Sequence, residues 1–97
     1  MLVYIHVSVD FKLEYQIMSP TVFRYKKYRF YFFSREENRM HVHIASPDGE
    51  VKFWIEPLVA LADYKGLTKR ELGELEKVVK DHVKDITEAW KKHSCGR

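Results

Sequence analysis

The chain has 97 residues, enough for one hydrophobic core but not for two, so we expect a single domain. Its 17 Lys and Arg residues against 14 Asp and Glu residues give a formal net charge of +3, too small to indicate nucleic-acid binding alone. The only cysteine, Cys95, excludes an intramolecular disulfide and a metal site that needs several thiolates from one chain. No stretch approaches the length of a membrane span and no signal peptide is evident, so we expect a soluble cytoplasmic protein without a membrane partner.

The first predicted elements are strands. Residues 2–15 alternate between apolar and polar side chains, the pattern of a half-buried strand, and Pro20 ends any regular element before it. Residues 22–25 and 28–33 are two further β-rich runs, separated by Lys26 and Lys27. They form either a tight hairpin or one bent strand, because the pair lacks the Gly or Asn that a primed two-residue turn prefers.

The best-defined hairpin surrounds the tetrapeptide Ser46-Pro47-Asp48-Gly49, between strands predicted over residues 41–44 and 51–55. In this turn Pro sets its own φ, Asp can accept a bond from the backbone, and Gly tolerates positive φ. Residues 58–64 follow as a predicted short helical turn.

A helix is predicted to begin at Thr68, because Thr68 and Glu71 have the spacing of a capping box. Its apolar positions recur every three or four residues: Leu72, Leu75, Val78, Val79, Val83, Ile86 and Trp90. One apolar stripe should therefore face the sheet. The predicted class is α+β, an antiparallel sheet of three to five strands packed on a long C-terminal amphipathic helix.

Two histidines are the sharpest chemical feature. His41 and His43 are two residues apart on one strand, so both should project from the same face, roughly 7 Å apart. We expect this to be the more exposed face, with Val42 and Ile44 turned to the helix. The pair could act as acid and base or ligate a metal with a third ligand from Asp48, Glu50, Glu56 or His82, but no metal motif is present and no cofactor is expected. The alternative is two ordinary polar residues on a solvent face.

Aromatic and basic residues interleave between residues 24 and 33. Tyr25, Tyr28, Tyr31 and Phe33 alternate with Arg24, Lys26, Lys27 and Arg29, as on a surface that stacks bases and contacts phosphates. The alternative is that Phe30 and Phe32 belong to the core and the cations keep a sheet edge soluble. Trp54 should emerge on the face of the Tyr or His side chains, where a Trp can dominate binding. The candidate binding residues are Arg24, Lys27, Arg29, Tyr31, His41, His43 and Trp54.

Several segments together resemble the small bacterial domain-of-unknown-function family 4160. They are Ser19-Pro20-Thr21-Val22-Phe23-Arg24, Tyr28-Arg29-Phe30-Tyr31-Phe32-Phe33-Ser34, His41-Val42-His43, Gly49-Glu50-Val51-Lys52-Phe53-Trp54-Ile55-Glu56-Pro57 and Glu88-Ala89-Trp90. Members typically begin near the equivalent of Met18. The resemblance therefore implies one domain over residues 18–97, with residues 1–17 either an added strand or the product of an upstream start codon.

The resemblance also implies a partner, because genes of that family often neighbour a second uncharacterised family, number 2442, in arrangements like toxin–antitoxin pairs. Our first hypothesis is accordingly a small partner-binding or regulatory module with no established reaction. The alternative is a nucleic-acid-binding protein or a ribonuclease that uses His41 and His43. A metal-binding domain is the third. A homo-oligomer is also expected, because an edge strand and an aromatic sheet face both favour pairing.

Overall fold

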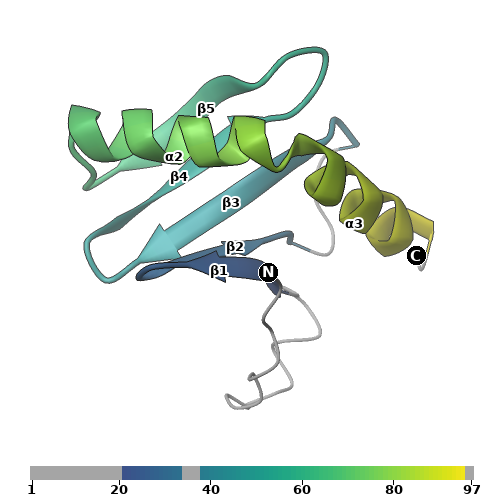
Figure 1. Cartoon of the computed structure of the whole chain (residues 1–97), viewed down its shortest axis with the longest axis horizontal. Helices are drawn as coiled ribbons and strands as arrows, with labels where there is room; N and C mark the ends of the chain where they lie inside the picture. The colour runs from purple at the N-terminus through teal and green to yellow at the C-terminus, as the bar shows by residue number, and fades with distance from the viewer. Residues whose placement is uncertain (1–20, 34–37, 96–97) are drawn as a thin grey trace.

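A five-stranded antiparallel sheet and two helices form the part of the chain that the computed structural model describes, residues 21–33 and 38–95 (Figure 1). The elements in chain order are β1 (Thr21–Tyr25), β2 (Tyr28–Tyr31), β3 (His41–Ser46), β4 (Gly49–Trp54), β5 (Ala60–Lys65), α2 (Lys69–Asp81) and α3 (Val83–Cys95). Each strand pairs with the next along the chain, so the sheet is a meander. The predicted α+β class is confirmed. The strand predicted over residues 2–15 lies outside the described residues.

The β1–β2 connection is a tight hairpin, and residues 22–33 do not form one bent strand. Tyr25 pairs with Tyr28, so Lys26 and Lys27 are the two turn residues. Lys26 has a φ of 54°, in the left-handed region that Gly or Asn usually occupies in such turns. A lysine therefore holds this backbone position, and its ammonium donates to Glu74 of α2.

The β3–β4 turn forms where it was predicted, with Ser46 paired to Gly49. The expected reason for the glycine was wrong, because the positive φ belongs to Gly66, at 79°, and not to Gly49. A Cβ on Gly49 would lie 2.1 Å from the carbonyl oxygen of Lys65. Gly49 is therefore required by the close approach of the backbone at the end of β5, at Lys65 and Gly66.

The helical turn predicted over residues 58–64 is wrong, because Ala60–Lys65 forms strand β5. Lys52 pairs with Asp63 and Glu50 with Lys65 along the edge of β4. Most β5 side chains are exposed, so the segment lacks the apolar alternation by which half-buried strands are recognised. Hydrogen bonding to β4, and not local pattern, makes it a strand.

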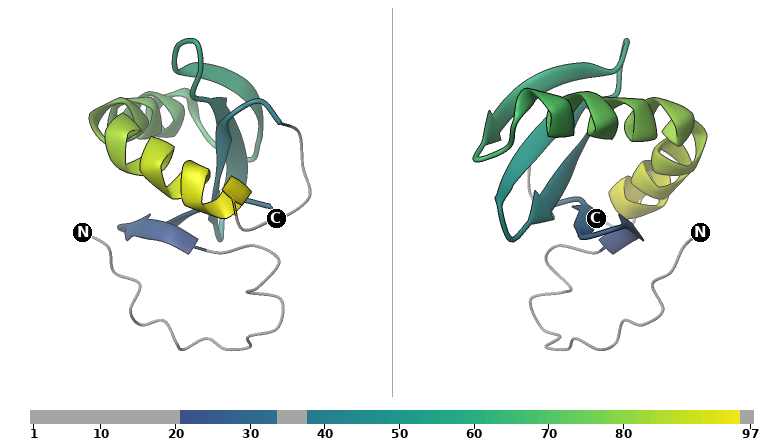
Figure 2. Two further views of the ribbon diagram at one scale, coloured as in Figure 1. Left: turned by 90° about the vertical axis from the view of Figure 1, so that its right-hand side faces the viewer. Right: turned by 60° about the vertical axis from the view of Figure 1, so that its left-hand side comes forward.

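The predicted C-terminal helix begins as expected but is divided in two. Thr68 caps α2, accepting from the backbone N–H of Glu71 while the Glu71 carboxylate accepts from the Thr68 N–H. At His82 the backbone N–H donates to the carbonyls of Val78 and Val79, and the ring Nδ1 donates to Val78 at 2.8 Å. His82 therefore ends α2. The chain changes direction there, and both helices remain on one side of the sheet (Figure 2).

The core lies between the helices and the inner face of the sheet. Phe30, Ile44 and Phe53 on the strands are buried with Leu75 and Val79 of α2 and with Ile86 of α3. The apolar stripe predicted for the helix is thus the sheet-packing surface. Burying each such side chain stabilises the fold by about 1.5–3 kcal/mol.

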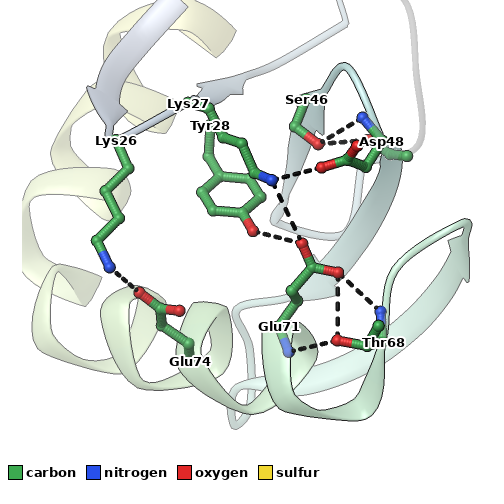
Figure 3. Close-up of polar contacts among 9 residues, drawn as sticks. Lys26, Lys27, Tyr28, Ser46, Asp48, Thr68, Glu71 and Glu74 are labelled. Atoms are coloured by element: carbon green, nitrogen blue, oxygen red, sulfur yellow. Dashed lines mark hydrogen bonds and ion pairs between the residues drawn. The ribbon is translucent and has the colours of Figure 1, made fainter.

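A polar clamp joins the β1–β2 hairpin to α2 (Figure 3). We call it the hairpin clamp; its members are Tyr25, Lys26, Lys27, Tyr28, Glu71 and Glu74. The Tyr25 hydroxyl and the Lys26 ammonium both donate to Glu74, at 2.6 Å and 2.8 Å. The Tyr28 hydroxyl donates to Glu71 at 2.9 Å. Lys26 lowers the pKa of Glu74, helped by Tyr25, and the Thr68 backbone N–H lowers the pKa of Glu71, helped by Tyr28.

Two glycine substitutions should have opposite effects on stability. Gly49→Ala should lower the free energy of unfolding by more than about 2 kcal/mol, because its Cβ would collide with backbone atoms of Lys65 and Gly66. Gly73→Ala, in exposed α2 with nothing within 4 Å, should raise it by about 0.5–1 kcal/mol. Urea denaturation measures both. Equal stability of the two variants would contradict the close approach at Gly49.

Acid should weaken the hairpin clamp. Because the folded-state pKa values of Glu71 and Glu74 are lowered, their contribution is complete above the pKa of unfolded glutamate and is lost as pH falls through the lowered values. The double variant Glu71→Gln, Glu74→Gln should therefore show a shallower loss of unfolding free energy below about pH 5 than the wild type. Glu88→Gln, exposed on α3, is the matched control and should keep the wild-type slope.

Candidate functional site

The side of the sheet that faces away from the helices carries most of the predicted site residues. We call it the outer face. Strand pairing aligns its side chains in rows: Tyr31, His43, Lys52 and Asp63 in one; Arg24, Arg29, Ala45, Glu50 and Lys65 in the next; and His41 with Trp54 in a third. Among the described residues, neither helix lies over this face (Figure 2).

Four rings of the outer face, Tyr31, Phe33, His43 and Trp54, form one aromatic cluster with the buried ring of His41. The His43 ring is at its centre, 5.4 Å from Tyr31, 4.5 Å from Phe33 and 5.0 Å from His41 between ring centroids. Tyr31 and Phe33 meet edge to face at 5.3 Å. Tyr31 is almost fully buried, whereas Phe33 is 42% exposed. The cluster is therefore buried at Tyr31 and exposed to solvent at Phe33.

Cationic side chains lie on the rings of this cluster. The Arg29 guanidinium is 4.5 Å from the centroid of Tyr31. The Arg39 guanidinium and the Lys52 ammonium are 4.1 Å and 4.4 Å from the centroid of Trp54. The Nε of Arg39 also donates to the carbonyl of Glu56 at 3.0 Å, which holds its guanidinium in place. Such contacts contribute about 0.5–1 kcal/mol each at exposed sites.

His41 is not exposed as predicted, because its side chain is fully buried. It lies at the start of β3, and the ring of Trp90 on α3 is 5.1 Å from its own. Trp54 covers it from the neighbouring strand at 5.8 Å. Its Nδ1 donates to the carbonyl of Arg39 at 2.7 Å. His41 therefore supports the cluster from below.

A metal site at His41 and His43 stays a prediction, and it needs a third ligand. Among the residues that the structure describes, no three His, Cys, Asp or Glu side chains are grouped to hold a metal ion. Of the expected third ligands, His82 packs against Phe23 at 4.8 Å in the core and Asp48 pairs with Lys27. These two therefore serve the fold and not the histidines.

The structure brings together six of the seven predicted binding residues. The outer face holds Arg29, Tyr31, His43 and Trp54, with His41 buried beside them. Arg24 of β1 lies opposite Arg29 of β2 in the strand register. Lys27 is the exception. It lies at the hairpin turn, in ion pairs with Asp48 and with Glu71 at 3.7 Å. Its charge is thus used by the hairpin clamp.

Sequence reasoning missed Arg39 and Lys52 as members of the site. Lys52 is two residues from Trp54 on one strand, and that spacing alone puts both side chains on one face. Arg39 follows from the turn at Pro47 and Asp48, since the register it sets brings residue 39 beside Glu56, next to Trp54. Both signals were present in the sequence.

A groove of about 510 Å³ runs along the outer face toward β5. Tyr31, Phe33 and His43 form its aromatic side, and its charged residues are Glu50, Lys52, Asp63 and Lys65. The groove therefore offers an apolar wall together with charges of both signs.

Comparisons with known proteins give one assignment. Within the described residues, neither helix is long and apolar enough to traverse a bilayer. The searches of curated proteins and of solved structures gave no significant match. The family described as "Domain of unknown function (DUF4160)" matches residues 28–91, which include β2 to β5, α2 and most of α3. Because this match covers more than half of the chain, the protein belongs to the DUF4160 family.

Proposed function

We propose that this protein is a small non-catalytic binding module, one half of a two-protein pair of the toxin–antitoxin kind, which holds its partner on the outer face in the cytoplasm. One observation carries the proposal: the aromatic cluster and its cations lie on a sheet face that neither helix covers in the described part of the chain. The family resemblance supplies the partner, the product of a neighbouring gene of family 2442.

The residue types on this face are those that dominate protein interfaces. Trp, Tyr and Arg are enriched at hot spots, where an anchor lies in a pocket and surrounding residues exclude water. Half-buried Trp54, with the Arg39 guanidinium 4.1 Å from its ring, combines two of these types. Phe33, 42% exposed, adds apolar area beside them. Trp54 and Arg39 are accordingly the proposed anchors.

Nucleic-acid binding is the second candidate and has less support. Arg29 over Tyr31 resembles a cation beside a base-stacking ring. However, Glu50 and Asp63 line the same groove, and their carboxylates would repel phosphates. A ribonuclease that needs both histidines also conflicts with the burial of His41, whose side chain has no solvent contact. Mixed charge and a buried histidine both favour the protein partner.

Co-purification tests the proposal. The chain is expressed with the product of the neighbouring gene, the complex is purified through a tag on that product, and its mass and absorbance at 260 nm are measured. Trp54→Ala should raise the dissociation constant of the complex by about 30-fold or more, and Arg39→Glu should raise it by about tenfold or more, as expected for hot-spot residues. Arg70→Glu, an exposed reversal on α2, is the control and should change affinity less than about twofold.

Two results would contradict the proposal. One is a complex that forms with wild-type affinity in both Trp54→Ala and Arg39→Glu, with folding verified by circular dichroism. The other is a chain that elutes alone and carries RNA or DNA, which would favour the nucleic-acid candidate.

A further inference from the structure

Strand β5 (Ala60–Lys65) presents a free edge in the part of the chain that the structure describes. It is last in the strand order, and its described partner is β4 alone. Of the four large apolar side chains that are exposed among the described residues, three lie on β5 or just before it: Leu58, Leu61 and Tyr64, with exposed fractions of 73%, 46% and 51%. An edge of this kind is a ready template for another strand, and natural proteins usually protect it.

The backbone of β5 can exchange its present bond for a strand partner. The N–H of Tyr64 donates to the carboxylate of its neighbour Asp63 at 2.9 Å, an exposed bond within two adjacent residues. If a second strand supplied a carbonyl to this N–H, the Asp63 carboxylate would be released toward a cation. A strand partner could therefore bond the Tyr64 N–H and, with a cation, pair with the Asp63 carboxylate.

The charges of β5 are complementary to themselves. In an antiparallel pair of identical strands related by a two-fold axis at Tyr64, Asp63 of each copy lies opposite Lys65 of the other, and the two Tyr64 side chains face each other. Moving the axis to residue 63 would place the two Asp63 carboxylates side by side. Moving it to residue 62 would bring the pairing across the irregularity opposite Lys52 and Phe53. Only the axis at Tyr64 gives two ion pairs in a regular segment.

We propose that two copies of this chain associate through their β5 edges, with the two-fold axis at Tyr64 and two Asp63–Lys65 ion pairs. The two five-stranded sheets then become continuous, with the helices of both copies on the same side of the joined sheet. Asp63, Tyr64 and Lys65 also line the groove on the outer face, so the two grooves meet at the axis. This association does not depend on the proposed function.

Sedimentation equilibrium of the full chain without any partner tests the proposal. The wild type should move from 11.7 kDa toward twice that mass with increasing concentration. Asp63→Lys or Lys65→Asp alone puts like charges opposite each other and should raise the dimer dissociation constant by about tenfold or more. An equimolar mixture of the two variants restores both ion pairs and should form a heterodimer at least as tight as the wild-type dimer.

Glu88→Lys and Lys91→Asp are the matched controls, because they make the same charge changes at exposed positions of α3. They should dimerise like the wild type. Three results would overturn the proposal: a wild type that stays monomeric up to hundreds of micromolar, as expected if another segment or partner occupies the edge; single variants that dimerise normally; or a mixture of the two variants that stays monomeric.

Discussion

The apolar layer between the inner face of the sheet and the two helices is the interaction on which the rest of the structure depends. Phe30, Ile44 and Phe53 meet Leu75, Val79 and Ile86 with almost no exposed area. The hairpin clamp adds polar contacts to this layer, because Tyr25 and Tyr28 of the β1–β2 hairpin donate to Glu74 and Glu71 of α2.

Much of the fold could be predicted because its determinants are local. The turn residues at Pro47 and Asp48 and the capping box at Thr68 specify a hairpin and a helix start within a few residues. Strand β5 could not be found this way, because both of its faces are largely exposed and its state comes from hydrogen bonds to β4. The division at His82 was also hidden, since the apolar stripe continues through it without Gly or Pro.

The candidate site was partly predictable for a related reason. Strand alternation places Arg29, Tyr31, His43 and Trp54 on one face, and the structure agrees. Strand alternation does not tell which side chains of that face are buried by other elements. Burial of His41 depends on Trp90, 49 positions later in the chain, and the engagement of Lys27 depends on how far a turn lysine reaches toward α2. Long-range packing decided both, and neither leaves a local signal.

The alternation of the strands has a consequence for how such a protein can diversify. Along β4, Val51 and Phe53 belong to the core while Lys52 and Trp54 belong to the outer face, so every second residue is under a different constraint. Substitutions at outward positions such as Lys52 can alter the exposed surface while the inward residues of the same strand keep the core packed. One stable scaffold can thereby carry many different outer surfaces.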